Sequence, residues 1–155
     1  MLAAAGCGGG DAERRTVEGT GYTFSAPASW SVVRTQRQLQ AVRGKGSLEL
    51  VAVSRFPLVH TFKAELWPKV VRELDRAAED IARQQHGSVI QTRTVTISGV
   101  KARRYDVAYD LRGKKLVERL AFVLRGKTEY LLLCRYEQRS TSDACDALME
   151  TFRLA

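Results

Sequence analysis

Beyond residue 20, apolar and polar residues alternate along most of the chain, as they do in strands that bury one face. Short turns containing glycine or proline separate these stretches, and short turns join strands that run antiparallel. We therefore expect an antiparallel sheet of about seven strands. The alternating segments are 21–25, 30–33, 38–42, 47–56, 88–97, 100–111, 116–124 and 129–137. The last is apolar at almost every position from Tyr130 to Cys134, which predicts a central strand covered on both faces.

An apolar spacing of three and four residues replaces this alternation between residues 62 and 82, and it predicts one long helix. The apolar positions are Phe62, Leu66, Val70, Leu74, Ala77, Ala78, Ile81 and Ala82. Pro68 fits best in the first turn of a helix, so the helix should begin near Trp67. Gly87 should end it, because glycine readily takes the left-handed conformation that follows many helices.

A shorter helix should close the chain. Ser142 is a suitable N-cap residue, and the apolar side chains beyond it share one helical face. These side chains are Cys145, Leu148, Met149 and Phe152. An antiparallel sheet with helices packed on its faces places the protein in the α+β fold class.

The chain opens with "MLAAAGCGGGD", and Ala5-Gly6-Cys7 resembles the end of a bacterial lipobox. In that motif small residues precede a cysteine whose sulfur receives a diacylglycerol, and the following Gly8–Gly10 run suits a flexible tether. Ala4 stands where leucine is commoner, and only six residues precede the cysteine, so residues 2–6 would be the end of a longer signal. We expect residues 1–18 to be a lipobox remnant and tether, and residues 19–155 to be one domain.

Two other interpretations of Cys7 remain. It can be an incidental cysteine in a frayed terminus. It can also belong to a metal or redox site, although no cysteine or histidine lies at ligand spacing nearby.

Three cysteines are an awkward number in an exported protein. Lipidation of Cys7 would leave Cys134 on the last predicted strand and Cys145 on the closing helix. We expect these two to form a disulfide, with Cα atoms about 4.4–6.8 Å apart. The alternative is a pair of buried free thiols that act as small apolar side chains.

The net charge of +8 favours anionic neighbours such as lipid head groups or wall polymers. The arginines are spread over turns and strand faces and do not interleave with exposed aromatic residues, so we expect no nucleic acid partner. "RGKT" at 125–128 resembles the end of a phosphate-binding loop, but Ala121 stands where that motif requires glycine.

The sequence contains no set of residues that predicts catalysis or metal binding. His60 and His86 are far apart and have no acidic or cysteine residue at ligand spacing. The carboxylates of the long helix, Asp75, Glu79 and Asp80, are spaced to pair with Arg72, Arg76 and Arg83. We therefore expect no enzyme, no catalytic residue, no metal and no cofactor.

Residues 20–155 resemble the PsbP-like fold family. The resemblance rests on "GYTFSAPASWSVV", "TISGVKARRYDV", "EYLLLCRY" and "CDALMETFRL". It implies an α/β/α sandwich, in a family whose members are mostly non-enzymatic binding or assembly proteins. Tyr22 and Trp30, the most prominent aromatic residues in these motifs, are expected in the core.

These observations predict a monomeric bacterial envelope lipoprotein, held at the extracytoplasmic face of the cell membrane by lipid on Cys7. It would bind an envelope protein or an anionic polymer without catalysing a reaction. The alternative is a soluble cytosolic protein-interaction domain in which Cys7 has no role.

Overall fold

A computed structural model describes residues 13–44 and 46–155 of the chain. The strands of this part are β1 (Arg14–Gly19), β2 (Tyr22–Pro27), β3 (Ser31–Arg34), β4 (Gln38–Val42), β5 (Leu50–Pro57), β6 (Ser88–Ile97), β7 (Val100–Leu111), β8 (Lys114–Arg125), β9 (Thr128–Glu137) and β10 (Arg153–Leu154). The helices are a short 3₁₀ turn, η1 (Ala64–Leu66), followed by α1 (Trp67–Gln84) and α2 (Asp143–Thr151).

Seven strands form one antiparallel sheet in the order β3-β4-β5-β9-β8-β7-β6. The predicted sheet and the α+β fold class are therefore confirmed. β9 occupies the middle of the sheet, as its apolar run predicted. Its neighbour β8 is the most deeply buried strand, with every residue from Leu116 to Leu124 buried.

A second sheet has three strands in the order β1-β2-β10, and the sequence did not predict it. β1 overlaps the predicted tether, so the expectation that residues 14–18 lie outside the domain is wrong. The reason is that β1 buries only Val17, opposite Phe24 of β2. One apolar residue among polar ones leaves no alternation to recognise.

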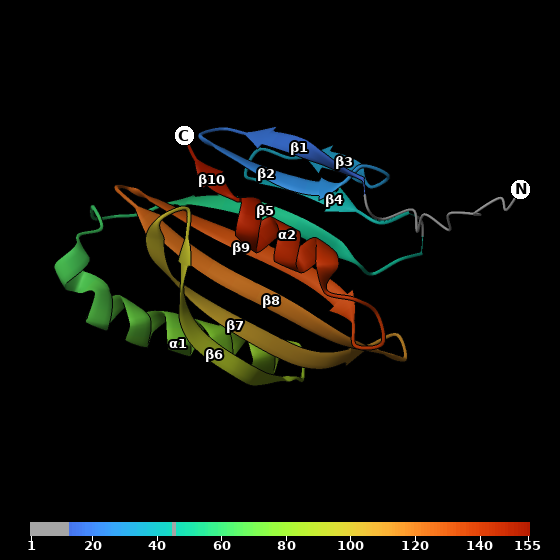
Figure 1. Cartoon of the computed structure of the whole chain (residues 1–155). Helices are drawn as coiled ribbons and strands as arrows, with labels where there is room; N and C mark the ends of the chain where they lie inside the picture. Colours follow the sequence, from blue (N-terminus) through green and yellow to red (C-terminus); the bar gives the residue numbers. More distant parts are fainter. Residues whose placement is uncertain (1–12, 45) are drawn as a thin grey trace, which may run out of the picture.

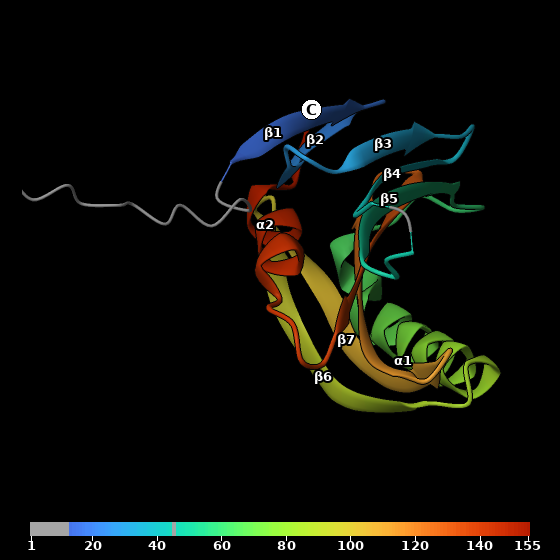
Figure 2. The same ribbon diagram turned by 90° about the vertical axis from the view of Figure 1, so that its right-hand side faces the viewer.

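The elements form layers around the large sheet (Figures 1 and 2). α2 and the three-stranded sheet cover one face, and Tyr22 and Trp30 are buried there, 4% and 7% exposed, as predicted. α1 covers part of the other face, next to β6 and β7. No helix in the described ranges is long and apolar enough to span a membrane.

α1 begins at Trp67 with proline in its first turn, as predicted, but its end differs from the prediction. His86, not Gly87, takes the left-handed conformation, with φ of 55°. The backbone N–H of His86 donates to Arg83 and that of Gly87 donates to Ala82, which is the Schellman pattern. Gly87 is needed because a Cβ atom there would lie 2.3 Å from the carbonyl oxygen of Ala108 in β7.

α2 begins directly after Ser142, at the predicted position, but the serine side chain does not cap the helix backbone. Instead, its hydroxyl donates a hydrogen bond of 2.9 Å to the carboxylate of Asp146. Asp146 in turn binds the sheet, so the start of α2 is held by side chains that attach it to β8.

Candidate functional site

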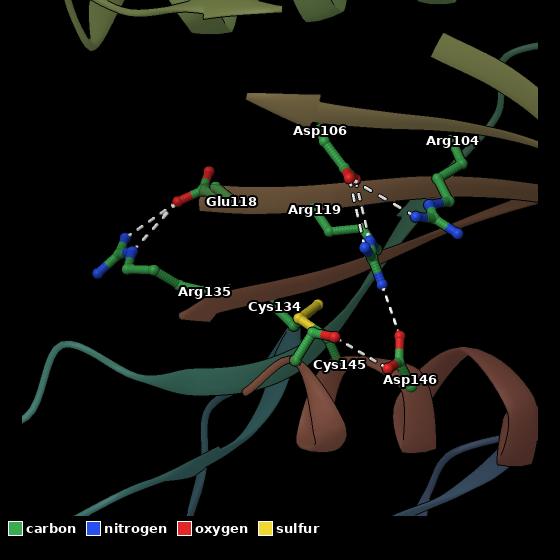
Figure 3. Close-up of a disulfide and its surroundings, with 9 residues drawn as sticks. Arg104, Asp106, Glu118, Arg119, Cys134, Arg135, Cys145 and Asp146 are labelled. Atoms are coloured by element: carbon green, nitrogen blue, oxygen red, sulfur yellow. Dashed lines mark hydrogen bonds and ion pairs between the residues drawn. A yellow bond between two sulfur atoms is a disulfide. The ribbon is translucent and has the colours of Figure 1, made fainter. Parts of the chain in front are cut away.

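A disulfide joins the centre of the large sheet to the first turn of α2 (Figure 3). Cys134 of β9 and Cys145 of α2 are bonded, and their Cα atoms lie 5.4 Å apart, within the range that the prediction required. Both side chains are buried. The bond therefore fixes one end of α2 to the central strand.

A row of charged residues lies beside this disulfide, on the same face of the sheet. Arg119 of β8 is the register partner of both Cys134 and Asp106 of β7. Its guanidinium donates to both oxygens of Asp106, at 2.9 and 3.3 Å, and to Asp146 of α2 at 2.9 Å. Arg104 adds a contact of 3.6 Å to Asp106. The neighbouring sheet residues Cys134 and Arg119 thus hold two consecutive residues of α2 (Figure 3). Cys134 holds Cys145 by the disulfide, and Arg119 holds Asp146 by an ion pair.

This charge row is structural. The side chains of Asp106 and Arg119 are each 8% exposed, and each is paired, as buried charges must be. Burial opposes the charge of Arg119, but hydrogen bonds to its two carboxylate partners outweigh burial and raise its pKa. The arginine is therefore a permanent cation that fastens α2 to β8 and β7.

A second buried carboxylate, Glu118, points to the opposite face of the sheet. It accepts hydrogen bonds from Arg135 at 3.2 Å, from the Tyr109 hydroxyl at 2.9 Å and from Gln85 at 3.1 Å. Burial, followed by the neighbouring Glu118 charge, raises the pKa of Tyr109 well above its ordinary value. The tyrosine therefore stays protonated and donates to the carboxylate.

A pocket of about 450 Å³ opens at the end of the domain where the disulfide attaches α2. It is formed by the start of β1, the end of β2, the β4–β5 connection, the end of β9 and the first turn of α2. Its charged lining residues are Arg14, Arg43, Glu49, Arg135 and Asp143. We call it the disulfide-end pocket. Its size lies within the range of sites that bind small molecules or head groups.

Three arginines and two acidic residues line this pocket, and Glu118 behind its wall balances the third arginine. Glu49 is bound by Arg43 at 2.6 Å, and Arg135 is bound to Glu118 behind the pocket wall. Arg14 and Asp143 are exposed at its rim. Trp30 and Tyr136 add aromatic surface, and burial raises the pKa of the Tyr136 hydroxyl, so this hydroxyl remains a hydrogen-bond donor. The pocket can bind a polar group, with Arg14 as the exposed cation at its rim.

The structure does not assemble the other residues considered from the sequence into a site. Among the described residues, no group of three or more histidine, cysteine or acidic residues could hold a metal. His60 lies exposed in the β5–α1 loop, and His86 ends α1. Cys7, the predicted lipidation residue, lies outside the described residues.

The carboxylates of α1 pair only partly as predicted. Asp80 does pair with Arg83. Asp75 instead accepts hydrogen bonds from Arg103 of β7 at 3.0 Å and from Tyr105 at 2.5 Å. Burial acts to raise the pKa of Asp75, but these hydrogen bonds hold it below its ordinary value.

Comparisons with known proteins identify the architecture. No known family and no curated protein matches the sequence. The solution structure of a cyanobacterial PsbP, CyanoP from Synechocystis, does match, with a TM-score of 0.60 at 15% identity, over 99% of this chain and 98% of CyanoP. The chain has the PsbP-like fold. At this identity the likeness establishes the fold alone.

Two further crystal structures share the architecture. LpqN of Mycobacterium tuberculosis, which is involved in cell envelope biogenesis, matches with a TM-score of 0.54 at 10% identity, over 92% of this chain and 91% of LpqN. A protein from Bacteroides thetaiotaomicron matches with a TM-score of 0.64 at 9% identity, over 94% of this chain. The match covers 49% of the Bacteroides protein, so this chain spans about half of its length. The PsbP-like fold is thus one part of that larger protein.

Proposed function

We propose that this chain is a non-enzymatic envelope lipoprotein, held on the extracytoplasmic side of the membrane by lipid on Cys7. Its disulfide-end pocket binds anionic head groups of that membrane. The PsbP-like fold, shared with an envelope biogenesis protein of another bacterium, supports the location. The disulfide between Cys134 and Cys145 also supports it, because such bonds persist mainly outside the cytosol.

The main support for the proposal is the position at which the N-terminal segment enters the folded domain. Arg14, the first residue of β1, lines the disulfide-end pocket and follows Cys7 by seven residues. Seven residues reach at most about 25 Å when fully extended. A lipid on Cys7 would therefore keep this pocket within that distance of the bilayer surface.

The same end of the domain carries charge of the matching sign. The β7–β8 turn and the segment that follows β9 meet there, since Gln138 donates its backbone N–H to Lys115. The exposed cations at this end are Arg14, Arg43, Arg112, Lys114, Lys115 and Arg139. Glu49 pairs with Arg43, Glu137 pairs with Lys114, and the exposed carboxylates of Asp110 and Asp143 offset part of the remaining charge. Each basic residue near an anionic bilayer contributes about 1 kcal/mol of attraction. Lipid anchoring and this attraction would act together on one surface.

The anchor is tested by replacing Cys7 in cells that express the chain with its complete upstream leader. Cys7→Ser should move the protein from the membrane fraction to the soluble fraction and remove the added lipid mass. Gly9→Ser, two residues further on, keeps the cysteine and should stay in the membrane fraction. Equal partitioning of both variants, with no lipid mass on either, would contradict the proposal.

The head-group site is tested with the full-length Cys7→Ser protein, so that no lipid chain contributes. It should bind vesicles containing phosphatidylglycerol and not vesicles of phosphatidylcholine alone. Arg14→Gln should weaken binding about fivefold, the equivalent of about 1 kcal/mol. Arg125→Gln removes the same charge from the last residue of β8, at the other end of the sheet, and should weaken vesicle binding less. Equal losses would show that only the overall charge matters.

A further inference from the structure

A second cavity lies at the opposite end of β9, and its chemistry differs from that of the disulfide-end pocket. It has a volume of about 280 Å³ and lies between the β5–α1 loop, the first turns of α1, and the strand ends next to the β8–β9 turn. Its apolar lining residues are Leu58, Val59, Phe62, Leu66, Val70, Leu74 and Leu124. We call it the Glu129 groove, after the carboxylate that lines it.

The wall of this groove is held in place by backbone hydrogen bonds. The N–H of Leu58 donates to the carbonyl of Lys127 at 2.8 Å, and that of Phe62 donates to Gly126 at 2.7 Å. These bonds fasten the β5–α1 loop to the β8–β9 turn. The shape of the groove is therefore fixed by the fold.

Glu129 brings a half-buried carboxylate into this apolar setting. Its register partners on the two adjacent strands are Phe56 and Leu124, so apolar residues flank it on both sides. Within residues 13–44 and 46–155, no hydrogen bond or ion pair reaches its carboxylate. Burial raises the pKa of Glu129, so a cation that paired with its carboxylate would stabilise the ionised form.

Other charged groups line the groove without neutralising Glu129. Lys69 and Glu73 of α1 and His60 of the loop all contribute to the lining. Neither Lys69 nor His60 lies within ion-pair distance of Glu129 in the described structure. The groove thus has two carboxylates and one lysine, a negative surplus in a chain whose net charge is +8.

The rim of the groove exposes apolar side chains to solvent. Val59 is 88% exposed and Leu66 is 38% exposed. The cavity is smaller than the roughly 300–1,000 Å³ of typical small-molecule sites, so it holds one long side chain. An apolar rim around a single-side-chain cavity is typical of an anchoring position in a protein interface.

We propose that the Glu129 groove binds a lysine side chain of a partner polypeptide. The aliphatic stem of the lysine would contact the leucines, and its ammonium group would pair with the Glu129 carboxylate. A long cationic side chain suits such a site because its methylene groups are apolar while its head is charged. This inference stands on the groove alone and does not depend on lipidation of Cys7 or on head-group binding.

The chemistry is tested by titrating the full-length Cys7→Ser protein with three six-carbon probes, followed by amide chemical shifts. Hexylammonium should bind at least about tenfold more tightly than hexanol or hexanoate, since a hydrogen bond to a charged group is worth more than a neutral one. Its shifts should map to the groove. Hexanoate binding as tightly as hexylammonium, or shifts outside the groove, would overturn the proposal.

Three variants test which carboxylate pairs with the ammonium group. Glu129→Gln should abolish the preference for hexylammonium while hexanol binding stays the same. Glu65→Gln removes the same charge from the exposed η1 turn outside the groove and should leave the preference intact. If Glu73→Gln abolished the preference and Glu129→Gln did not, the assignment to Glu129 would be wrong.

The polypeptide source is tested with the peptide Ala-Ala-Lys-Ala-Ala and its acetyl-lysine form. The unmodified peptide should bind at least as tightly as hexylammonium, and acetylation should weaken binding about tenfold, because it removes the charge. Binding of hexylammonium without binding of the peptide would assign the groove to a free amine and refute a polypeptide partner.

Discussion

Loss of the disulfide should lower the stability of the domain by an amount that the loop length determines. Cys134 and Cys145 are 11 positions apart, and closing a loop of that length removes about 2.8 kcal/mol of conformational entropy from the unfolded chain at 25 °C. For a domain of about 150 residues, each kcal/mol corresponds to roughly 2–4 °C in Tm. We therefore expect full reduction to lower Tm by roughly 6–11 °C.

The rest of α2 should stay folded below this lower Tm, because other contacts hold it. Asp146 is bound to Arg119, and Leu148 and Phe152 are completely buried in the core. Reduction should therefore move a single cooperative unfolding transition to lower temperature. The near-ultraviolet circular dichroism of the folded protein should stay largely unchanged at 20 °C.

The assay is thermal unfolding of full-length Cys7→Ser protein with and without a reductant, with the thiols counted by mass spectrometry after alkylation. The double variant Cys134→Ala/Cys145→Ala is the control, since its Tm should be low in both conditions and insensitive to the reductant. The reasoning is refuted if complete reduction leaves Tm unchanged. It is also refuted if two thiols are found in the protein purified without reductant.

Three further predictions concern the contacts that place α1 and α2. Arg119→Met leaves Asp106 buried without its main partner, so urea denaturation should show a loss of about 3–5 kcal/mol, and an intact midpoint would contradict the pairing. Gly87→Ala should cost about 1–3 kcal/mol by steric conflict, whereas His86→Gly, which removes left-handed strain, should stabilise by up to about 1 kcal/mol; calorimetry of both variants would detect a reversed order. Asp75 has a pKa below its unfolded value of 3.8, so its stabilisation is present above that pH and disappears as the pH falls through the folded pKa. Asp75→Asn should therefore lower Tm by a few degrees at pH 7, and this effect should shrink as the pH falls below 3.8.

Most strands of the large sheet could be predicted because apolar residues recur at every second position or, in β8 and β9, occupy nearly every position. β3 could be predicted from Val32 although all four of its residues are exposed. β1 and β10 could not be predicted for two different physical reasons. β1 buries Val17 alone, and β10 has two residues and exists only because the chain after α2 passes beside Tyr22 and Thr23 of β2. Their pairing depends on tertiary contacts that a local pattern does not contain.

The position of the α1 terminus shows how a correct sequence signal can have another cause. Gly87 marks the end of the helix, yet its backbone is not left-handed. It is glycine because β7 approaches so closely that a side chain would strike a carbonyl group. The strain of the left-handed turn falls on His86, and nothing in the local sequence distinguishes these two roles.

The candidate site was only partly visible in the sequence. The disulfide could be predicted from the cysteine count and from the elements on which the two cysteines lie. Arg119 and Asp106 occupy polar positions of alternating strands, where a pattern alone predicts exposure, and they are buried because α2 returns across them. The disulfide-end pocket likewise combines five segments that are far apart in the sequence.

The two cavities lie toward opposite ends of β9, and this separation constrains how both could operate. Eight residue steps along the strand separate Glu129 from Glu137, which is about 26 Å in a strand. If Arg14 is held near the bilayer, the Glu129 groove is directed away from it, toward polypeptides outside the membrane. The two sites should then act independently, because the rigid central sheet lies between them. Arg14→Gln should leave hexylammonium affinity unchanged, and Glu129→Gln should leave vesicle binding unchanged. A change of more than about twofold in either cross-test would show that the sheet couples the two ends, since sites that do not interact give additive effects.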